Sequence, residues 1–214
     1  MQDIQKNYWS RAYRAAFVLQ LVPFIRMVGV NGSLARGEAT EKSDIDFLVV
    51  AVAGRIWTCR FLTTVIVALM GIKRTANKIS GRICLNRFIT SDSLSIYPYD
   101  EYHARNYSLT CPILDINIYE RFIIENCWMN NFSEIKDFSG QRLENSKILH
   151  RLQKAIEKIL SSRMGLYIEK RLKNYQLNKI KKNILTKNNQ GMIVANDRML
   201  CFHPTSKFNL TNLG

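Results

Sequence analysis

The most informative part of the chain is residues 32–47, which read GSLARGEATEKSDIDF. A turn of small residues is followed by two aspartates, Asp44 and Asp46, with one isoleucine between them. Side chains two positions apart on a strand point to the same face, so these carboxylates should lie side by side while Ile45 and Phe47 face the core. Adjacent carboxylates repel each other unless a cation joins them, and Mg²⁺ prefers oxygen ligands. The pattern therefore predicts a divalent metal site on a strand.

An apolar run at residues 26–30 predicts a buried strand that leads into Gly32 and Ser33. Gly32 has no Cβ, so the backbone can turn sharply there and a phosphate can approach exposed amides closely. If a short helix begins at Leu34, Ser33 takes its N-cap position and presents free N–H groups to a phosphate. The Ser33 hydroxyl and the Arg36 guanidinium would add a donor and a positive charge. We therefore expect a triphosphate between this turn and the metal.

These residues resemble the signature of the nucleotidyltransferases of the DNA polymerase beta superfamily, which is Gly-Ser, a gap of about ten residues, then Asp-hydrophobic-Asp-hydrophobic. Here the signature is Gly32-Ser33 and residues 44–47, and the intervening residues 35–37 look like the minimal nucleotidyltransferase subgroup. The resemblance implies transfer of a nucleoside monophosphate from a nucleoside triphosphate, such as ATP, to a hydroxyl acceptor, with release of pyrophosphate. It implies Mg²⁺ or Mn²⁺ as cofactor, Asp44 and Asp46 as catalytic metal ligands, and Gly32, Ser33 and Arg36 as triphosphate-binding residues. The acceptor stays open: a nucleic-acid end, a small molecule or a partner protein.

The resemblance also implies a third carboxylate on a later strand, and the chain does not plainly supply it. Asn86, in the apolar run at residues 82–89, is the residue most nearly placed for this role. An amide oxygen can coordinate a metal, but it carries no charge and accepts no proton at neutral pH. Asp92 and Asp115 are alternatives in turn-like contexts. A rival interpretation follows: a catalytically impaired nucleotidyltransferase-fold module that binds nucleotide or RNA.

Composition indicates a cytoplasmic globular protein. The length of 214 residues suits one domain or a domain with an appendage, and the hydrophobic content of 47% is ordinary for a globular chain. The five cysteines form no Cys-x-x-Cys pair and indicate buried thiols in a reducing compartment. The N-terminus lacks an apolar signal core. The apolar run at residues 61–72 is too short to span a bilayer, so we expect a buried crossover helix and no stable membrane insertion.

The pattern of apolar residues predicts an α/β (α+β) fold with a small mixed sheet and helices, and the resemblance implies that residues 1–133 form its nucleotidyltransferase core. His103 falls on an expected helix and is interpreted as a packing or surface residue. The expected helices are 7–22 (ending at Pro23), 56–71, 99–105 and 118–128, and the expected strands are 25–30, 44–53 and 82–89.

Residues 134–214 differ in charge: they hold 16 lysines and arginines against 6 acidic residues, whereas residues 1–133 hold 15 against 11. This basic region is expected to be mainly helical and to end in a short hairpin around Asn196 and Asp197. Such one-sided charge attracts RNA or another polyanion. Membrane-surface association through the run at Phe61 and this basic region is a further alternative.

Two amphipathic helices are predicted within the basic region. The first carries an apolar stripe, and the second continues after Gly165. We expect these stripes to pack on the core and leave a cationic face outside. Tyr167 and Tyr175 fit either base stacking or half-buried packing, of which packing is the expectation. The stripe of the first helix consists of Ile148, Leu152, Ile156, Ile159 and Leu160.

Overall fold

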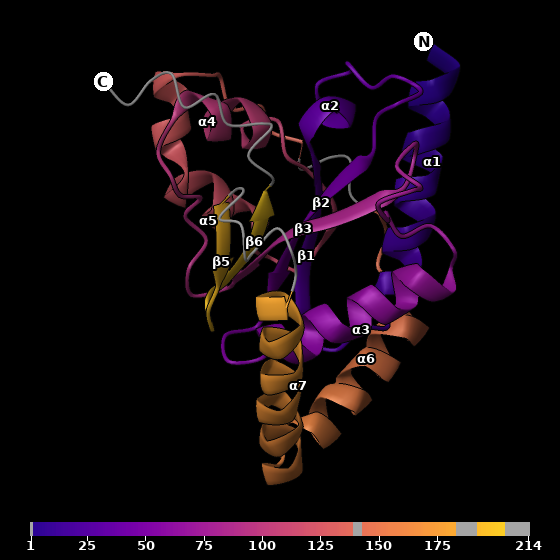
Figure 1. Cartoon of the computed structure of the whole chain (residues 1–214), viewed down its shortest axis with the longest axis vertical. Coiled ribbons are helices and arrows are strands. Elements are labelled where there is room, and N and C mark those ends of the chain that lie inside the picture. Colours follow the sequence, from indigo (N-terminus) through magenta and orange to yellow (C-terminus); the bar gives the residue numbers. More distant parts are fainter. Residues whose placement is uncertain (1, 139–142, 183–191, 204–214) are drawn as a thin grey trace.

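The computed structural model describes residues 2–138, 143–182 and 192–203. Helices surround a six-stranded mixed sheet with strand order β4-β1-β2-β3-β6-β5 (Figure 1). The fold is the α/β class that the sequence predicts. The strands are β1 (Ile25–Asn31), β2 (Ile45–Ala51), β3 (Ile83–Thr90), β4 (Cys111–Asp115), β5 (Met192–Ala195) and β6 (Met199–His203). The helices are α1 (Gln2–Leu19), α2 (Gly32–Ala35), α3 (Ile56–Leu69), α4 (Glu101–Tyr107), α5 (Tyr119–Glu125), the 3₁₀ helix η1 (Cys127–Asn131), α6 (Lys147–Leu160) and α7 (Arg163–Lys182).

The central strand β2 is buried along its whole length because helices cover both faces of the sheet. Phe47 and Val49 belong to the hydrophobic cluster that includes residues of α1 and α3. Leu48 and Val50 belong to a second cluster, which includes residues of α4 and α5. Alternate residues thus enter opposite cores, as strand geometry requires.

Strand pairing brings distant parts of the chain to the start of β2. Strand β1 runs antiparallel to β2 and places Asn31 opposite Asp46. Strand β3 runs parallel to β2 and places Cys84 opposite Asp46. The next recorded pair is Leu48 with Arg87, so β3 contains an irregularity of one extra residue beside Asp46. The end of β1 and the beginnings of β2 and β3 therefore meet at one place.

Strand β4 was not predicted from the sequence. It is an edge strand that pairs with β1, and it contains Pro112. Proline has no N–H to donate and is tolerated at sheet edges, but in a five-residue segment it also resembles a loop signal. The pairing register shifts between Val28 and Gly29, next to Pro112.

The C-terminal region contributes to the same sheet. Strands β5 and β6 form the predicted hairpin around Asn196 and Asp197, and β6 pairs with β3. Helix α7 packs against α3. The division at residue 133 stays a prediction, and contacts between the two parts cross it.

The expectation that both apolar stripes pack on the core is wrong for α6. Its residues Ile148, Leu152, Ile156 and Ile159 are exposed, while Leu160 reaches the core cluster. Polar residues of α6 hold the helix to the body instead, which reverses the usual arrangement. The expectation for Tyr167 and Tyr175 is also wrong, because both are exposed. Among the helices that the structure describes, none combines the length and apolar character needed to cross a membrane.

Candidate active site

The turn after β1 lies directly against Asp46. Gly32 has φ +70°, and a Cβ at this position would lie 2.5 Å from Asp46 Oδ2. Only glycine fits such a conformation and such an approach without strain. Helix α2 begins at Gly32 with Asn31 in the N-cap position, so the prediction of Ser33 as N-cap is wrong. Ser33 lies within the first turn of α2 because the chain enters the helix directly at the end of β1.

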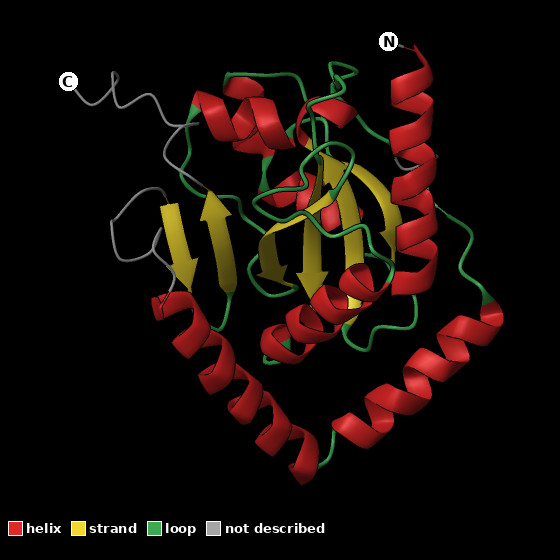
Figure 2. Cartoon of the chain, turned by 45° about the vertical axis from the view of Figure 1, so that its right-hand side comes forward, coloured by secondary structure: helices red, strands yellow, loops and turns green. Residues whose placement is uncertain are grey.

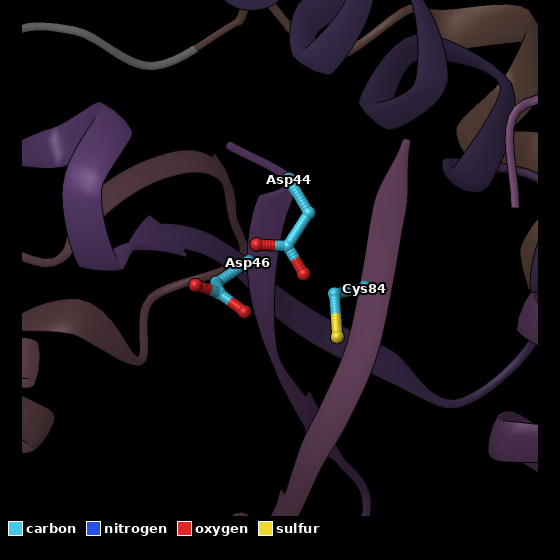
Figure 3. Close-up of side chains that lie close together, drawn as sticks. All are labelled: Asp44, Asp46 and Cys84. Carbon is cyan, nitrogen blue, oxygen red and sulfur yellow. The ribbon is translucent and has the colours of Figure 1, made fainter. Parts of the chain in front are cut away.

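Three side chains gather between the beginnings of β2 and β3. Asp44 precedes β2, Asp46 lies on it, and Cys84 lies opposite on β3. One ligand atom from each of the three lies within 4.8 Å of the others (Figure 3). The structure thus brings together the two predicted aspartates, and it adds Cys84, for which the sequence predicts only a buried thiol.

Arg74 lies at this cluster. Its Nη1 is 2.8 Å from Asp44 Oδ2 and donates to Cys84 Sγ at 3.3 Å. Burial, and then the charges of the two aspartates, raise the pKa of Cys84 to about 12, so in the protein alone it is a neutral thiol at pH 7. A guanidinium therefore supplies positive charge where the carboxylates converge.

Asn86 also reaches the cluster, through its nitrogen. Its Nδ2 donates to Asp46 Oδ1 at 3.0 Å. Its Oδ1 is buried and has no hydrogen-bond partner among the described residues. A buried polar atom without a partner is costly unless a ligand meets it. Two carboxylates with this amide oxygen form a donor set suited to Mg²⁺ or Mn²⁺, and a thiol beside them also suits softer metals.

The alternative third acids lie elsewhere. Asp92 is exposed and lies 3.6 Å from Arg198, beyond the other end of β3. Asp115 pairs with Met27 near the start of β1. Its Oδ1 accepts the backbone N–H groups of Ile118 and Tyr119, which is a local structural role. Neither aspartate belongs to the cluster.

Arg36 is engaged beside the site and does not reach the cluster in this structure. Its Nε lies 2.7 Å from Glu38 Oε2, and its Nη1 donates to Asn106 Oδ1 at 3.1 Å. The hydrogen bond from Arg36 lowers the pKa of Glu38. Arg36 would have to leave these partners to contact a triphosphate.

Helix α4 carries further rings, of which Tyr102 lies close enough to Asp46 to be affected by its charge. Burial, followed by the charge of Asp46, raises the pKa of Tyr102 to about 12. His103 is fully buried, and its Nδ1 lies 2.7 Å from Asp100 Oδ1. Burial lowers the pKa of His103, so the neutral form is favoured. This agrees with its interpretation as a packing residue. Tyr102 was not singled out from the sequence, since only the tertiary structure brings it within reach of Asp46.

The comparison with known proteins bears on this arrangement. A family model described as a nucleotidyltransferase domain matches residues 15–187. No curated protein matches the chain, and no solved structure does. The matched residues cover well over half of the chain and include the glycine turn, both aspartates and β3. The chain therefore belongs to the nucleotidyltransferase domain family.

Proposed function

We propose that this protein transfers a nucleoside monophosphate from a nucleoside triphosphate to a hydroxyl acceptor and releases pyrophosphate. The observation that carries the proposal is the convergence of Asp44 and Asp46 beside a turn that only glycine fits. Membership in the nucleotidyltransferase domain family supports the same reaction class.

Asp44 and Asp46 would hold the metal, with Asn86 Oδ1 or Cys84 Sγ as the third protein ligand. Bound Mg²⁺ or Mn²⁺ would offset the negative charge of the triphosphate at the reacting phosphorus. The Ser33 hydroxyl and the backbone of the Gly32 turn would bind the outer phosphates. Arg36, once released from Glu38, would add positive charge there.

The reaction is an in-line displacement at the α-phosphorus. The acceptor oxygen forms a bond to phosphorus, the bond to the pyrophosphate oxygen breaks, and the pyrophosphate leaves. The described cluster contains no third carboxylate, and the Asn86 amide accepts no proton. We therefore propose that the acceptor hydroxyl loses its proton to solvent.

The rival function is a module that binds nucleotide or RNA without turnover. A specific observation favours it: the positions on β3 next to Asp46 carry a thiol and an amide instead of a carboxylate. Without a carboxylate at this place, the site would lack a general base, which typically contributes a factor of about 10² or more to the rate.

One experiment separates the two functions. The protein is incubated with each α-³²P-labelled nucleoside triphosphate, Mg²⁺ or Mn²⁺, and bulk cellular RNA, and label transfer is measured. We expect transfer by the wild type and a loss of roughly a thousandfold in Asp44→Ala and Asp46→Ala. Asp92→Ala is the matched control and should retain activity. Triphosphate binding by the wild type without transfer to any acceptor would favour the binding module.

A further inference from the structure

Helix α6 turns its apolar face away from the protein. Ile148 is 71% exposed, Leu152 49%, Ile156 37% and Ile159 63%. Spacings of four, four and three residues place these side chains in one stripe along the helix. We call this set the α6 stripe. Its residues are all aliphatic, and none of them packs into either hydrophobic core cluster.

Polar contacts fix this orientation of α6. Gln153 Nε2 donates to the Val22 carbonyl at 2.8 Å. Glu157 Oε1 accepts the Phe24 N–H at 2.7 Å and lies 2.8 Å from Arg26 Nη1. Rotating the helix to bury the stripe would break these bonds and leave Arg26 and the Phe24 N–H without their partner, which is costly. The stripe is therefore exposed because the opposite face is anchored.

The exposed charges on α6 itself have one sign. Every exposed charged residue of α6 is basic: Lys147, Arg151, Lys154 and Lys158. At 3.6 residues per turn these four side chains fall within a sector of about 60°, which is separated from the α6 stripe by a gap of about 60°. The only acid of the helix, Glu157, is buried and paired with Arg26 and with Lys154. A surface that complements α6 must be apolar and carry negative charge.

The shape of the molecule leaves this face accessible. Helices α6 and α7 meet at a tip that points away from the sheet (Figure 2). Arg163, Met164 and Leu166 at the start of α7 are exposed next to this tip. Basic and apolar side chains are therefore exposed together near this tip.

We propose that α6 docks on an anionic lipid bilayer, with the α6 stripe in the interfacial layer and the basic sector of the helix at the headgroups. An amphipathic helix with lysine and arginine beside aliphatic residues binds bilayers in this way without spanning them. A second copy of the chain fits less well, since it would bring one basic sector against another. The stripe also lacks the aromatic anchors that dominate protein interfaces.

The test uses nuclease-treated full-length protein and sedimentation with vesicles of phosphatidylcholine, with or without phosphatidylglycerol. We expect binding to the anionic vesicles only, weakened by salt. The double variant Leu152→Glu with Ile156→Glu should reduce binding by at least about tenfold. Both positions are exposed, so the fold should persist, which circular dichroism checks. The matched control is Val65→Glu with Leu69→Glu, at two exposed side chains four residues apart on α3; it changes the net charge by the same amount and should bind as wild type.

Several results would overturn the proposal. One is absence of binding to anionic vesicles at low salt, and another is binding that the double variant leaves unchanged. Light scattering gives a third: if the wild type is a dimer and the double variant a monomer, the stripe serves a second copy of the chain. Nucleotide transfer is measured separately and does not enter this test, so failure here leaves the proposed function intact.

Discussion

Gly32, the first residue of α2, lies against Asp46 on β2, and each restricts the other. The left-handed φ of Gly32 and the 2.5 Å approach of a Cβ to Asp46 Oδ2 allow no side chain between the turn and the carboxylate. The sequence predicted this proximity because Gly-Ser and the aspartate pair stand at the signature spacing. It could not predict Cys84, because the irregularity in β3 that sets both Cys84 and Asn86 beside Asp46 depends on strand pairing.

Gly32→Ala should move the Asp46 carboxylate and abolish label transfer. The positive φ alone should cost about 1 kcal/mol of unfolding free energy. Gly37→Ala is the control, since Gly37 has φ +73° and open space around its Cβ position. We expect both variants to lose similar stability in urea unfolding, while only Gly32→Ala loses transfer and metal binding. Full transfer by Gly32→Ala would show that the turn does not shape the site.

Asn86→Asp tests which residue of β3 completes the metal site. A carboxylate at this position adds charge and a proton acceptor, so Mg²⁺-dependent transfer should rise by about tenfold or more. No change, or a fall, would move the role to Cys84.

Cys84→Ser tests the thiol directly. Loss of sulfur should weaken the thermal stabilisation by Cd²⁺ or Zn²⁺ and leave that by Mg²⁺ nearly unchanged, because thiolates prefer softer metals. Equal thermal shifts with Cd²⁺ in Cys84→Ser and wild type would remove Cys84 from the ligand set.

Among the elements, strands and helices with strong apolar patterns were predicted to within a few residues, including β1, β3 and α3. β4 was missed because it is short and contains a proline. The prediction that the α6 stripe faces the core was wrong for a different reason. An apolar pattern shows that a helix has two faces, but long-range contacts such as that between Glu157 and Arg26 decide which face meets the body.

Glu157→Gln should lower the unfolding free energy by about 1–3 kcal/mol at pH 7. Burial alone would raise the pKa of Glu157, but hydrogen bonds from Arg26, the Phe24 N–H and Lys154 hold it below the ordinary value of 4.5. A carboxyl group whose pKa is lowered in the folded state stabilises the fold above pH 4.5. This stabilisation is lost as the pH falls through the lower pKa of the folded state. The gap between wild type and Glu157→Gln in urea unfolding should therefore narrow below pH 4.5. A gap independent of pH would contradict this account.

The whole molecule carries a formal charge of +14, concentrated after residue 133. The sequence predicted this concentration and its attraction for polyanions. In the structure, α7 exposes Lys170, Arg171, Lys181 and Lys182 to solvent, and Tyr167 and Tyr175 are exposed on the same helix. We retain RNA binding by α7 as a prediction at this scale.

Lys170→Glu with Arg171→Glu should weaken binding to single-stranded RNA by about tenfold and reduce its dependence on salt. Lys6→Glu with Arg14→Glu changes the net charge equally at exposed positions on α1 and serves as control. Filter binding over a range of salt concentrations measures both. Equal losses in the two double variants would mean that net charge alone attracts RNA and that α7 has no special part.

The pairing of β6 with β3 has a consequence for biosynthesis. A ribosome delivers β3 long before β6, so during translation the strand that carries Cys84 and Asn86 has one unpaired edge. Such an edge recruits other nascent chains unless something shields it. The β5–β6 hairpin, which is made later than β3, covers this edge, so a chain that ends before residue 199 should be prone to aggregation.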